Sequence, residues 1–239
     1  MVNVICMKWG TVYNPNYVNI LKRMVARHLS LPHRFVCLTD EPKGIDLGIE
    51  TLPIPSLGLP NNLPERGWNK LVTFRGDVGD LVGPSLFLDL DVAILDNIDC
   101  FFEHPGDFCM IKNWPPPHRE TGNSSVFRFE IGASPNIHKD FVEQHDTIRK
   151  RFRNDQEYLT EAMGKYGDFQ YWPESWCQSF KRHCIPKGLA RYFKGPVQPT
   201  NAKILVFHGT PKPDQAIHGY RGSVRRYTRP AEWIKDYWR

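Results

Sequence analysis

The stretch LFLDLDVAIL, residues 86–95, places two carboxylates inside an otherwise apolar run. Burying an uncompensated carboxylate is costly, so a buried strand does not accept two of them without a compensating partner. Since residues i and i+2 of an extended chain point to the same face, Asp89 and Asp91 are predicted to converge near the end of a strand. Two converging carboxylates favour a cation between them, and hard oxygen ligands suit Mn²⁺ or Mg²⁺. The alternative is a strand-end turn that carries two solvated aspartates.

The sequence on either side of this stretch predicts an α/β fold. Residues 2–7 form a continuous apolar run, Asn14-Pro15 begins a helix with one apolar face, and residues 34–39 form the next strand. Such a β-α-β unit predicts a mostly parallel sheet flanked by helices, which binds ligands at the carboxyl ends of its strands. Further predicted elements are strands at 85–88, 108–111, 124–129, 169–172 and 203–208, helices at 68–75, 137–148 and 154–163, and a proline-rich ordered loop at 50–65.

The composition limits the classes of protein that fit. A chain of 239 residues without an internal repeat is predicted to form one domain. A net charge of +5 fits an anionic ligand such as a nucleotide diphosphate, and the absence of a dense basic stripe outside the C-terminal region argues against nucleic-acid binding. We expect a cytoplasmic protein for three reasons. The six cysteines include no Cys-x-x-Cys pair, no signal peptide is visible, and no apolar run approaches 18 residues.

The Asp-x-Asp pattern by itself fits several chemistries. It resembles the first motif of haloacid-dehalogenase-type phosphatases, but there the motif lies near the N-terminus with an acidic motif downstream. Here a β-α-β unit precedes it, and the nearest acidic match, residues 76–80, lies upstream. A nucleotidyltransferase usually has a Gly-rich basic loop after the first strand, whereas residues 7–11 contain one glycine. A non-catalytic anion-binding module would leave Asp89 and Asp91 unexplained.

A second motif, VFHGTPKP at residues 206–213, extends the comparison. With the Asp pair it resembles the GT-A glycosyltransferases, in particular the retaining group of glycogenin and the bacterial lipo-oligosaccharide galactosyltransferases. The resemblance implies that Asp89, Asp91 and His208 bind the metal, and that Gly209 and Lys212 lie at the diphosphate. The family pattern is His-x-x-Gly-x-x-Lys-Pro-Trp. In this chain the spacing from the histidine to the lysine is two residues shorter, and an aspartate replaces the tryptophan.

Three shorter segments carry the same resemblance. Asn123 matches the family segment that lines the donor-sugar pocket, although a turn before a strand is an equal explanation. Asp155 and Gln156 match an Asp-Gln motif at a helix start beside the reacting anomeric carbon, so the resemblance implies a catalytic role. Asp155 alone would also favour the positive end of a helix. Lys70 matches a basic residue that holds the donor.

The end of the first strand is where such folds bind the nucleotide base. The resemblance therefore implies that Lys8, Trp9, Gly10 and Tyr13 contact the nucleotide, with ring stacking by Tyr13 or Trp9. Core packing is the alternative for Trp9. Asp40, at the end of the second strand, is a further candidate for contact with the base or ribose.

The resemblance also implies an overall organisation and activity. We expect a GT-A-type, Rossmann-like single domain with a nucleotide-binding half at 1–111, a donor-sugar and acceptor half at 112–215, and a basic aromatic tail at 216–239. The implied reaction moves a hexose from a UDP-linked or similar nucleotide-sugar to a glycan, lipid-linked or protein acceptor, with retention. Trp172 and Trp176 suit an acceptor-sugar face or a structural cluster. The tail suits contact with the inner membrane surface or a solvated chain end.

Overall fold

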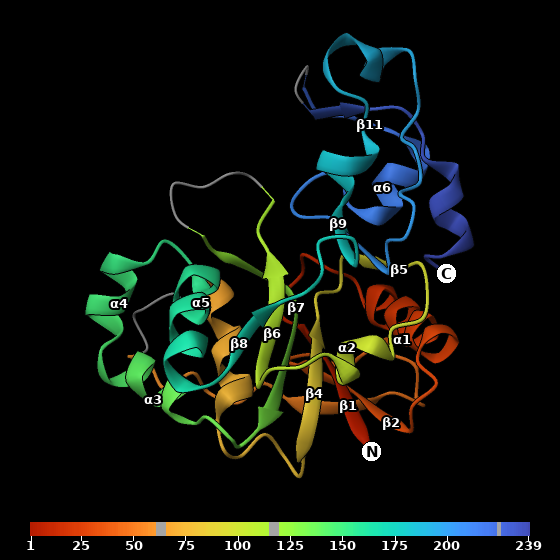
Figure 1. Cartoon of the computed structure of the whole chain (residues 1–239). Helices are drawn as coiled ribbons and strands as arrows, with labels where there is room; N and C mark the ends of the chain where they lie inside the picture. The colour runs from red at the N-terminus through yellow and green to blue at the C-terminus, as the bar shows by residue number, and fades with distance from the viewer. Residues whose placement is uncertain (61–65, 115–119, 224–225) are drawn as a thin grey trace.

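Seven strands from the first 171 residues form the main sheet of the molecule (Figure 1). The computed structural model describes residues 1–60, 66–114, 120–223 and 226–239. Across the sheet the strands are β3 (Glu50–Pro53), β2 (His33–Thr39), β1 (Val2–Lys8), β4 (Gly83–Leu88), β7 (Gly122–Ile131), β6 (Phe108–Lys112) and β8 (Phe169–Tyr171). Strand β7 runs antiparallel to both neighbours and the other pairs are parallel, which confirms the predicted α/β fold with a mostly parallel sheet.

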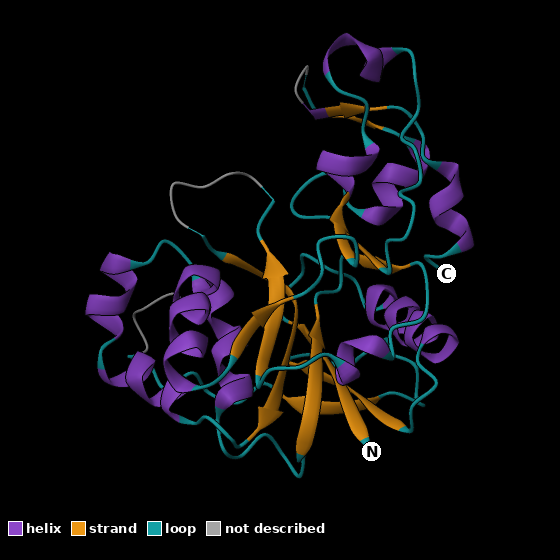
Figure 2. Ribbon diagram, viewed as in Figure 1, coloured by secondary structure: helices purple, strands orange, loops and turns teal. Residues whose placement is uncertain are grey.

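Helices cover both faces of this sheet (Figure 2). One face carries α1 (Asn16–His28) and α2 (Cys100–Glu103), and the other carries η1 (Arg66–Phe74), α3 (Asn136–Glu143), α4 (His145–Arg151) and α5 (Asp155–Tyr166). Side chains of β1 alternate between the two cores: Val4 and Cys6 pack with α1, while Ile5 and Met7 pack on the opposite side. This two-sided burial explains why the predicted strands are continuous apolar runs.

A smaller lobe stands at one end of the main sheet (Figure 1). Its three-stranded sheet has the order β5 (Val92–Ile94), β10 (Ile204–Val206) and β9 (Cys177–Ser179). The rest of the lobe consists of η2 (Phe180–Cys184), η3 (Gly188–Tyr192), α6 (Pro213–His218), β11 (Tyr220–Arg221), β12 (Tyr227–Thr228) and η5 (Glu232–Asp236). Because β5 follows β4 directly, the chain crosses from the main sheet to the lobe at residues 89–91.

The structure corrects several predicted elements. Glu50–Pro53, predicted as loop, is an edge strand. Its one proline, Pro53, is tolerated there because one side of an edge strand has no strand to pair with. The rest of that predicted loop includes 61–65, which lie outside the described residues. The helix predicted at 137–148 is divided at Gln144 into α3 and α4. Residues 216–239 are not a free tail, since Ile217 and Ile234 are buried in the core.

None of the helices in the described part of the chain combines the length and apolar character needed to span a membrane.

Candidate active site

A cavity of about 300 Å³ opens where β1 and β4 end, at the junction of the sheet and the smaller lobe. Ten of the predicted site residues line it, and they come from segments distant in the sequence. They are Trp9, Tyr13, Lys70, Asp89, Asp91, Asn123, Asp155, Gln156, His208 and Gly209. The position agrees with the rule that open α/β sheets bind ligands beyond the carboxyl ends of their strands.

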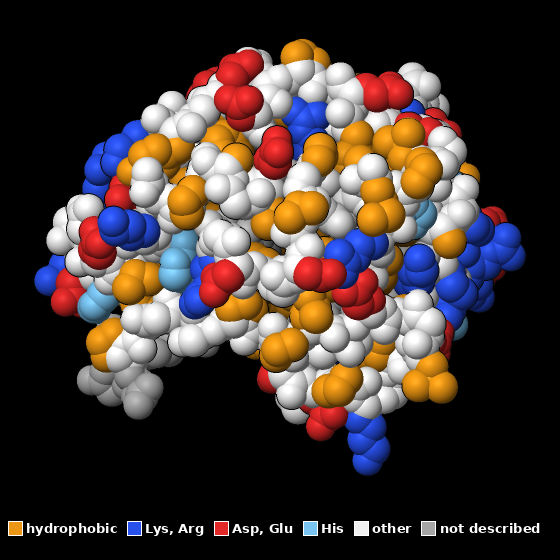
Figure 3. Space-filling model, turned by 90° about the horizontal axis from the view of Figure 1, so that it is seen from below, with side chains coloured by type: hydrophobic (Ala, Val, Ile, Leu, Met, Phe, Trp, Pro, Cys, Tyr) orange, Lys and Arg blue, Asp and Glu red, His pale blue; other side chains and the backbone are white. Residues whose placement is uncertain are grey.

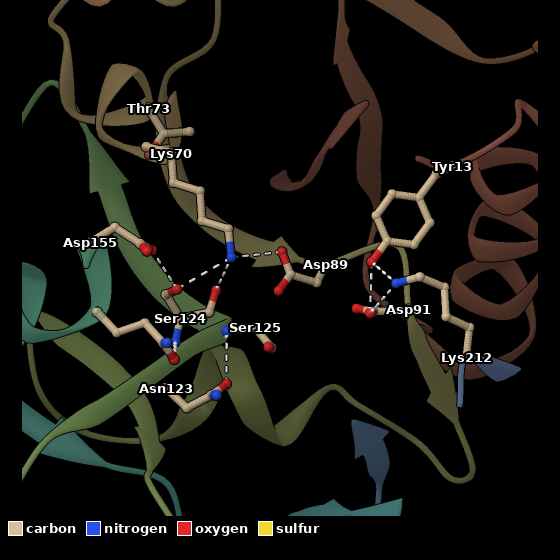
Figure 4. Close-up of polar contacts among 11 residues, drawn as sticks. Tyr13, Lys70, Thr73, Asp89, Asp91, Asn123, Ser124, Ser125, Asp155 and Lys212 are labelled. Carbon is tan, nitrogen blue, oxygen red and sulfur yellow. Dashed lines mark hydrogen bonds and ion pairs between the residues drawn. The ribbon is translucent and has the colours of Figure 1, made fainter. Parts of the chain in front are cut away.

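Asp89 is held on one side of the cavity by a buried lysine. Its backbone N–H donates to the carbonyl of Ser125 at 2.8 Å, which fixes the residue beside β7. Its Oδ1 lies 2.7 Å from Nζ of Lys70, and that ammonium also donates to the carbonyl of Ser124 at 3.0 Å (Figure 4). Burial by itself lowers the pKa of Lys70, but the charges of Asp89 and Asp155 outweigh burial and raise it. Lys70 is therefore a permanent cation at this site.

Asp91 is held on the other side by Tyr13 and Lys212 (Figure 4). The Tyr13 hydroxyl donates to Asp91 Oδ2 at 2.7 Å, and Nζ of Lys212 donates to the same oxygen at 3.2 Å and to the Tyr13 hydroxyl at 2.5 Å. Burial and the neighbouring Asp89 charge raise the pKa of Asp91, and the contacts with Lys212 and Tyr13 oppose this shift. The lysine thus balances a carboxylate that is 6% exposed.

The extended-chain geometry assumed for the two carboxylates is wrong, although both reach the same cavity. Asp89 and Asp91 line the same cavity, but each turns to its own lysine. The prediction assumed an extended chain through residue 91, whereas β4 ends at Leu88 and residues 90 and 91 form a turn before β5. Strand alternation therefore does not apply across the motif.

His208 follows β10 and lines the cavity from the smaller lobe. Its Nε2 lies 2.7 Å from the Ser179 hydroxyl, and its ring stacks on Trp114 with centroids 5.5 Å apart and an interplanar angle of 19°. Burial, with the nearby charges of Lys181 and Arg182, lowers the pKa of His208 to about 4. The imidazole is therefore neutral at pH 7, the form that coordinates metal ions.

The opposite wall is built by an irregular stretch of β7 and by the start of α5. The register between β6 and β7 shifts at Met110/Ile111, so β7 bulges at the site, as strands often do beside active sites. The Ser124 hydroxyl donates to Asp155 Oδ2 at 2.7 Å, and the Ser124 N–H donates to Gln156 Oε1 at 3.2 Å. These bonds join the bulge to the first turn of α5.

Asn123 and Asp155 are both buried, and each has an internal partner. Asn123 Oδ1 accepts from the N–H of Ser125 at 3.0 Å, and the residue lies within β7 rather than in a turn before a strand. The carboxylate of Asp155 faces Ser124 and the charge of Lys70. Burial raises the pKa of Asp155, and Lys70 opposes the shift. Asn154, one residue earlier, caps α5, since its Oδ1 accepts from the N–H of Glu157 at 3.1 Å.

Four predicted residues do not line the cavity. Lys212 nevertheless reaches the site through Asp91. The N–H of Gly10 donates to Asp40 Oδ2 at 2.9 Å, so these two residues form an exposed pair where β1 and β2 end. Lys8, the last residue of β1, is 4% exposed.

Sequence reasoning did not assign Lys181 to the site. Its Nζ donates to the carbonyl of His208 at 2.5 Å, which places a second lobe cation next to a residue that lines the cavity. Gly209 has a φ of 77°, and a Cβ there would lie 3.2 Å from this Nζ, so only glycine combines this backbone with a lysine so close. A usable signal was present: the sequence between Ser175 and Pro213 contains no acidic residue.

The donor set suits a divalent cation. Two carboxylates and a neutral imidazole line one cavity. Mn²⁺ binds both kinds of ligand, whereas Mg²⁺ would bind mainly to the two carboxylates. Within the described residues, no group of three or more His, Cys, Asp or Glu side chains lies close enough to hold a metal. Asp89 and Asp91 are each paired with a lysine instead, at 2.7 and 3.2 Å.

A second cavity, of about 420 Å³, lies beside the first. Trp114 borders it and stacks on His208, so the two cavities share this wall. Trp172 also lines it but is 2% exposed, and it packs with Trp176 at a centroid distance of 6.1 Å. The two tryptophans thus form a structural cluster, the alternative stated for them. Glu120, Glu174 and His183 supply polar groups to the lining.

The sheet order and the position of the cavity define the class: the chain has the GT-A fold found in glycosyltransferases. It is similar to the galactosyltransferase LgtC in complex with donor and acceptor sugar analogs, with a TM-score of 0.56, 14% identity and coverage of 98% of this chain and 94% of that one. An active-site mutant of LgtC gives a TM-score of 0.58 at 12% identity, again covering 98% of this chain and 94% of that one.

Two larger proteins share the fold. The glycosyltransferase GlyE of Streptococcus pneumoniae TIGR4 gives a TM-score of 0.64 at 12% identity, covering 99% of this chain and 60% of that one. The bifunctional glycosyltransferase WbbM gives 0.63 at 11% identity, covering 89% of this chain and 46% of that one. A scan against models of protein families and a search of curated protein sequences gave no match.

Proposed function

We propose that this protein is a glycosyltransferase that moves a hexose from a nucleotide-sugar, UDP-linked in the simplest case, to a hydroxyl acceptor with retention of configuration. One observation carries the proposal. Asp89 and Asp91 line a cavity at the strand ends of a GT-A fold, and each has a lysine within 3.2 Å. The lysines of such a site can bind the anionic diphosphate of a nucleotide-sugar, and the aspartates can bind the metal ion that accompanies it.

The cations of the site bind the donor's diphosphate in this account. Lys212 and Lys181 come from the smaller lobe, while Lys70 comes from the main domain. Together they would bind the diphosphate from both sides and stabilise the charge that develops on it when the sugar leaves. Trp9 and Tyr13, at the end of β1, would hold the base by ring stacking.

Asp89, Asp91 and His208 would hold the Mn²⁺ or Mg²⁺ ion. When bound, that ion supplies further neutralisation of the leaving diphosphate. His208 fits this role because it is neutral at pH 7 and its Nε2 lies beside the Ser179 hydroxyl, which fixes the ring.

Asp155 and Gln156 would face the donor sugar. Gln156 is a weak nucleophile, but its amide can hydrogen-bond to a charge-separated transition state beside the anomeric carbon. Because Asp155 is paired with Ser124 and faces Lys70, it is positioned to orient the sugar hydroxyls and the bulge. Asn123, in the same wall, would complete the sugar pocket.

The larger cavity would receive the acceptor. It shares Trp114 with the donor cavity, so a sugar there would lie beside the reacting centre. Aromatic rings pack against sugar C–H groups, and Glu120 and Glu174 can accept hydrogen bonds from sugar hydroxyls. This lining favours a glycan, free or linked to a lipid or protein.

A thermal-shift screen of nucleotide-sugars with Mn²⁺ tests the proposal, followed by measurement of nucleotide release from each hit. We expect one nucleotide-sugar family to raise the melting temperature, and the raised stability to need the cation. Asp77→Asn is the control variant, because Asp77 is an exposed residue paired with Arg75. A screen in which no nucleotide-sugar binds, or in which nucleotides bind equally to wild type and Asp91→Asn, would overturn the proposal.

A further inference from the structure

The positive charge of the chain is concentrated in the smaller lobe. Residues 180–231 contain eleven lysines and arginines and a single acidic residue, Asp214, although the net charge of the whole chain is only +5. The remainder of the chain is therefore net acidic. Figure 3 shows the face opposite the lobe, where red and blue side chains are mixed over most of the surface. The smaller lobe thus carries the chain's excess of positive charge.

The tip of this lobe also exposes large apolar side chains. Leu189 is 76% exposed, Phe193 78% and Val197 66%. All three lie in one stretch of nine residues, which covers part of η3 and the segment after it. Lys187 and Lys194 lie exposed between and beside them. The tip, residues 187–197, lies at the top of Figure 1 and farthest from the main sheet.

The tip is an ordered part of the fold. The N–H groups of Phe193 and Lys194 donate to the carbonyl of Ala190 at 3.1 and 2.8 Å, and the N–H of Val197 donates to the carbonyl of Cys184 at 2.9 Å. Tyr192 stacks on Tyr227 of the neighbouring hairpin, with ring centroids 5.0 Å apart. The apolar side chains are therefore held outward by a fixed backbone, which keeps them from collapsing onto the lobe.

We propose that the tip docks on the surface of an anionic lipid bilayer. Leu189, Phe193 and Val197 would enter the interface, and Lys187 and Lys194 would lie at the level of the anionic headgroups. Apolar side chains flanked by basic ones are the combination that interfacial binding needs, because neither kind alone anchors a protein firmly. An RNA or an acidic protein matches the charge but offers no apolar phase for two aliphatic side chains, so the bilayer explains both features.

This surface differs from the one that the sequence pattern suggested. The aromatic residues of the predicted tail face inward: Trp233 and Trp238 pack against the main core, and the Trp233 Nε1–H donates to the carbonyl of Pro196 at 3.1 Å. Arg229 remains exposed and donates to the carbonyl of Tyr192 at 3.2 Å, so the end of the chain supports the tip.

Co-sedimentation of the full chain with vesicles tests the proposal. The vesicles are phosphatidylcholine alone, or phosphatidylcholine with 30% phosphatidylglycerol, at low and at 0.5 M salt. We expect binding to the anionic vesicles only. L189S/F193S should lower the partition coefficient at least tenfold, and K187Q/K194Q should lower it roughly 20- to 30-fold, as expected for two basic residues at an anionic surface. High salt should weaken the binding because it screens surface charge.

Matched substitutions elsewhere provide the control. L47S/V82S replaces two apolar side chains that are also largely exposed, and K43Q/K150Q replaces two exposed lysines. Both pairs should bind vesicles as the wild type does, and circular dichroism should show that all variants are folded. The proposal is wrong if the wild type ignores anionic vesicles or if tip and control variants bind equally. It is also wrong if the tip variants lose binding to poly(U) RNA while their vesicle binding is unchanged.

Discussion

Trp114 stacks on His208 in a nearly parallel arrangement, with ring centroids 5.5 Å apart and an interplanar angle of 19°. The tryptophan is anchored because its Nε1–H donates to the carbonyl of Cys177 at 3.2 Å. It borders the larger cavity, while His208 lines the smaller one. This pair therefore connects the proposed donor and acceptor sites by a single ring contact.

Replacement of Trp114 is expected to affect the acceptor more than the donor. Trp114→Ala should raise the KM for the acceptor about fivefold, since an aromatic contact contributes ~1 kcal/mol beyond its buried area. The Kd for the nucleotide should change less than threefold. Trp114→Phe retains a ring and should recover most of the loss. Steady-state kinetics with both substrates varied provides the measurement, and an unchanged acceptor KM in the alanine variant would count against the shared wall.

Loss of the Lys70 cation is expected to destabilise the ligand-free protein. Lys70→Met leaves the carboxylates of Asp89 and Asp155 without their buried partner, so the free energy of unfolding should fall by about 3 kcal/mol. Urea unfolding followed by circular dichroism measures the change. Lys165→Met removes an exposed ion pair with Asp140 and should cost less than about 1 kcal/mol. Equal effects of the two substitutions would show that Lys70 has no special structural role.

Lys181 is expected to contribute to diphosphate binding. Lys181→Met removes a cation that lies at His208, and it should weaken binding of a nucleoside diphosphate about tenfold, in the range of a charge-assisted hydrogen bond. Lys203→Met is the matched control, because Lys203 pairs with Asp96 at 3.3 Å and does not line the cavity. Isothermal titration calorimetry compares the two. Equal affinities of the two variants for the nucleoside diphosphate would show that Lys181 does not contribute to its binding.

Gln156 is expected to act on turnover rather than on donor binding. Gln156→Ala should lower kcat by about 10²-fold, in the range of a lost oxyanion-type contact, while donor Kd stays within about threefold. NMR of the early product from a UDP-α-sugar should show an α-linkage. A β-linked product would contradict retention and would direct attention to Asp155 or Glu174 as a general base.

The sequence predicted the parts of the site that depend on local pattern. Strand ends and carboxylates can be recognised from hydrophobic runs, and Asp89 and Asp91 were found in this way, whereas Lys70 was assigned by the motif resemblance. His208 and Asp91 lie in the same cavity because strands that are distant in the sequence pair with each other. Val206 pairs with Val92 in the smaller sheet, and the N–H of Phe207 donates to the carbonyl of Asp91 at 3.0 Å. In the sequence, the motif resemblance alone joined these residues.

Two features of the site could not be predicted from the sequence because they result from tertiary contacts between strands. The bulge in β7 arises from a register shift against β6, which no periodicity within β7 reveals. The turn at residues 90 and 91 exists because the chain leaves the main sheet there, and Val92–Ile94 pair with β10. A continuous apolar run is equally consistent with one long strand or with two strands in different sheets.

The most direct measurement is calorimetric titration of UDP into the wild type and Asp91→Asn, each with Mn²⁺ and with a chelator. We expect the wild type to bind UDP with an affinity that falls at least tenfold when the cation is removed, and a similar loss in Asp91→Asn with Mn²⁺ present. Asp77→Asn should behave as the wild type in both conditions. UDP affinity that is the same with Mn²⁺ and with chelator would show that Asp89 and Asp91 do not bind the donor through a cation.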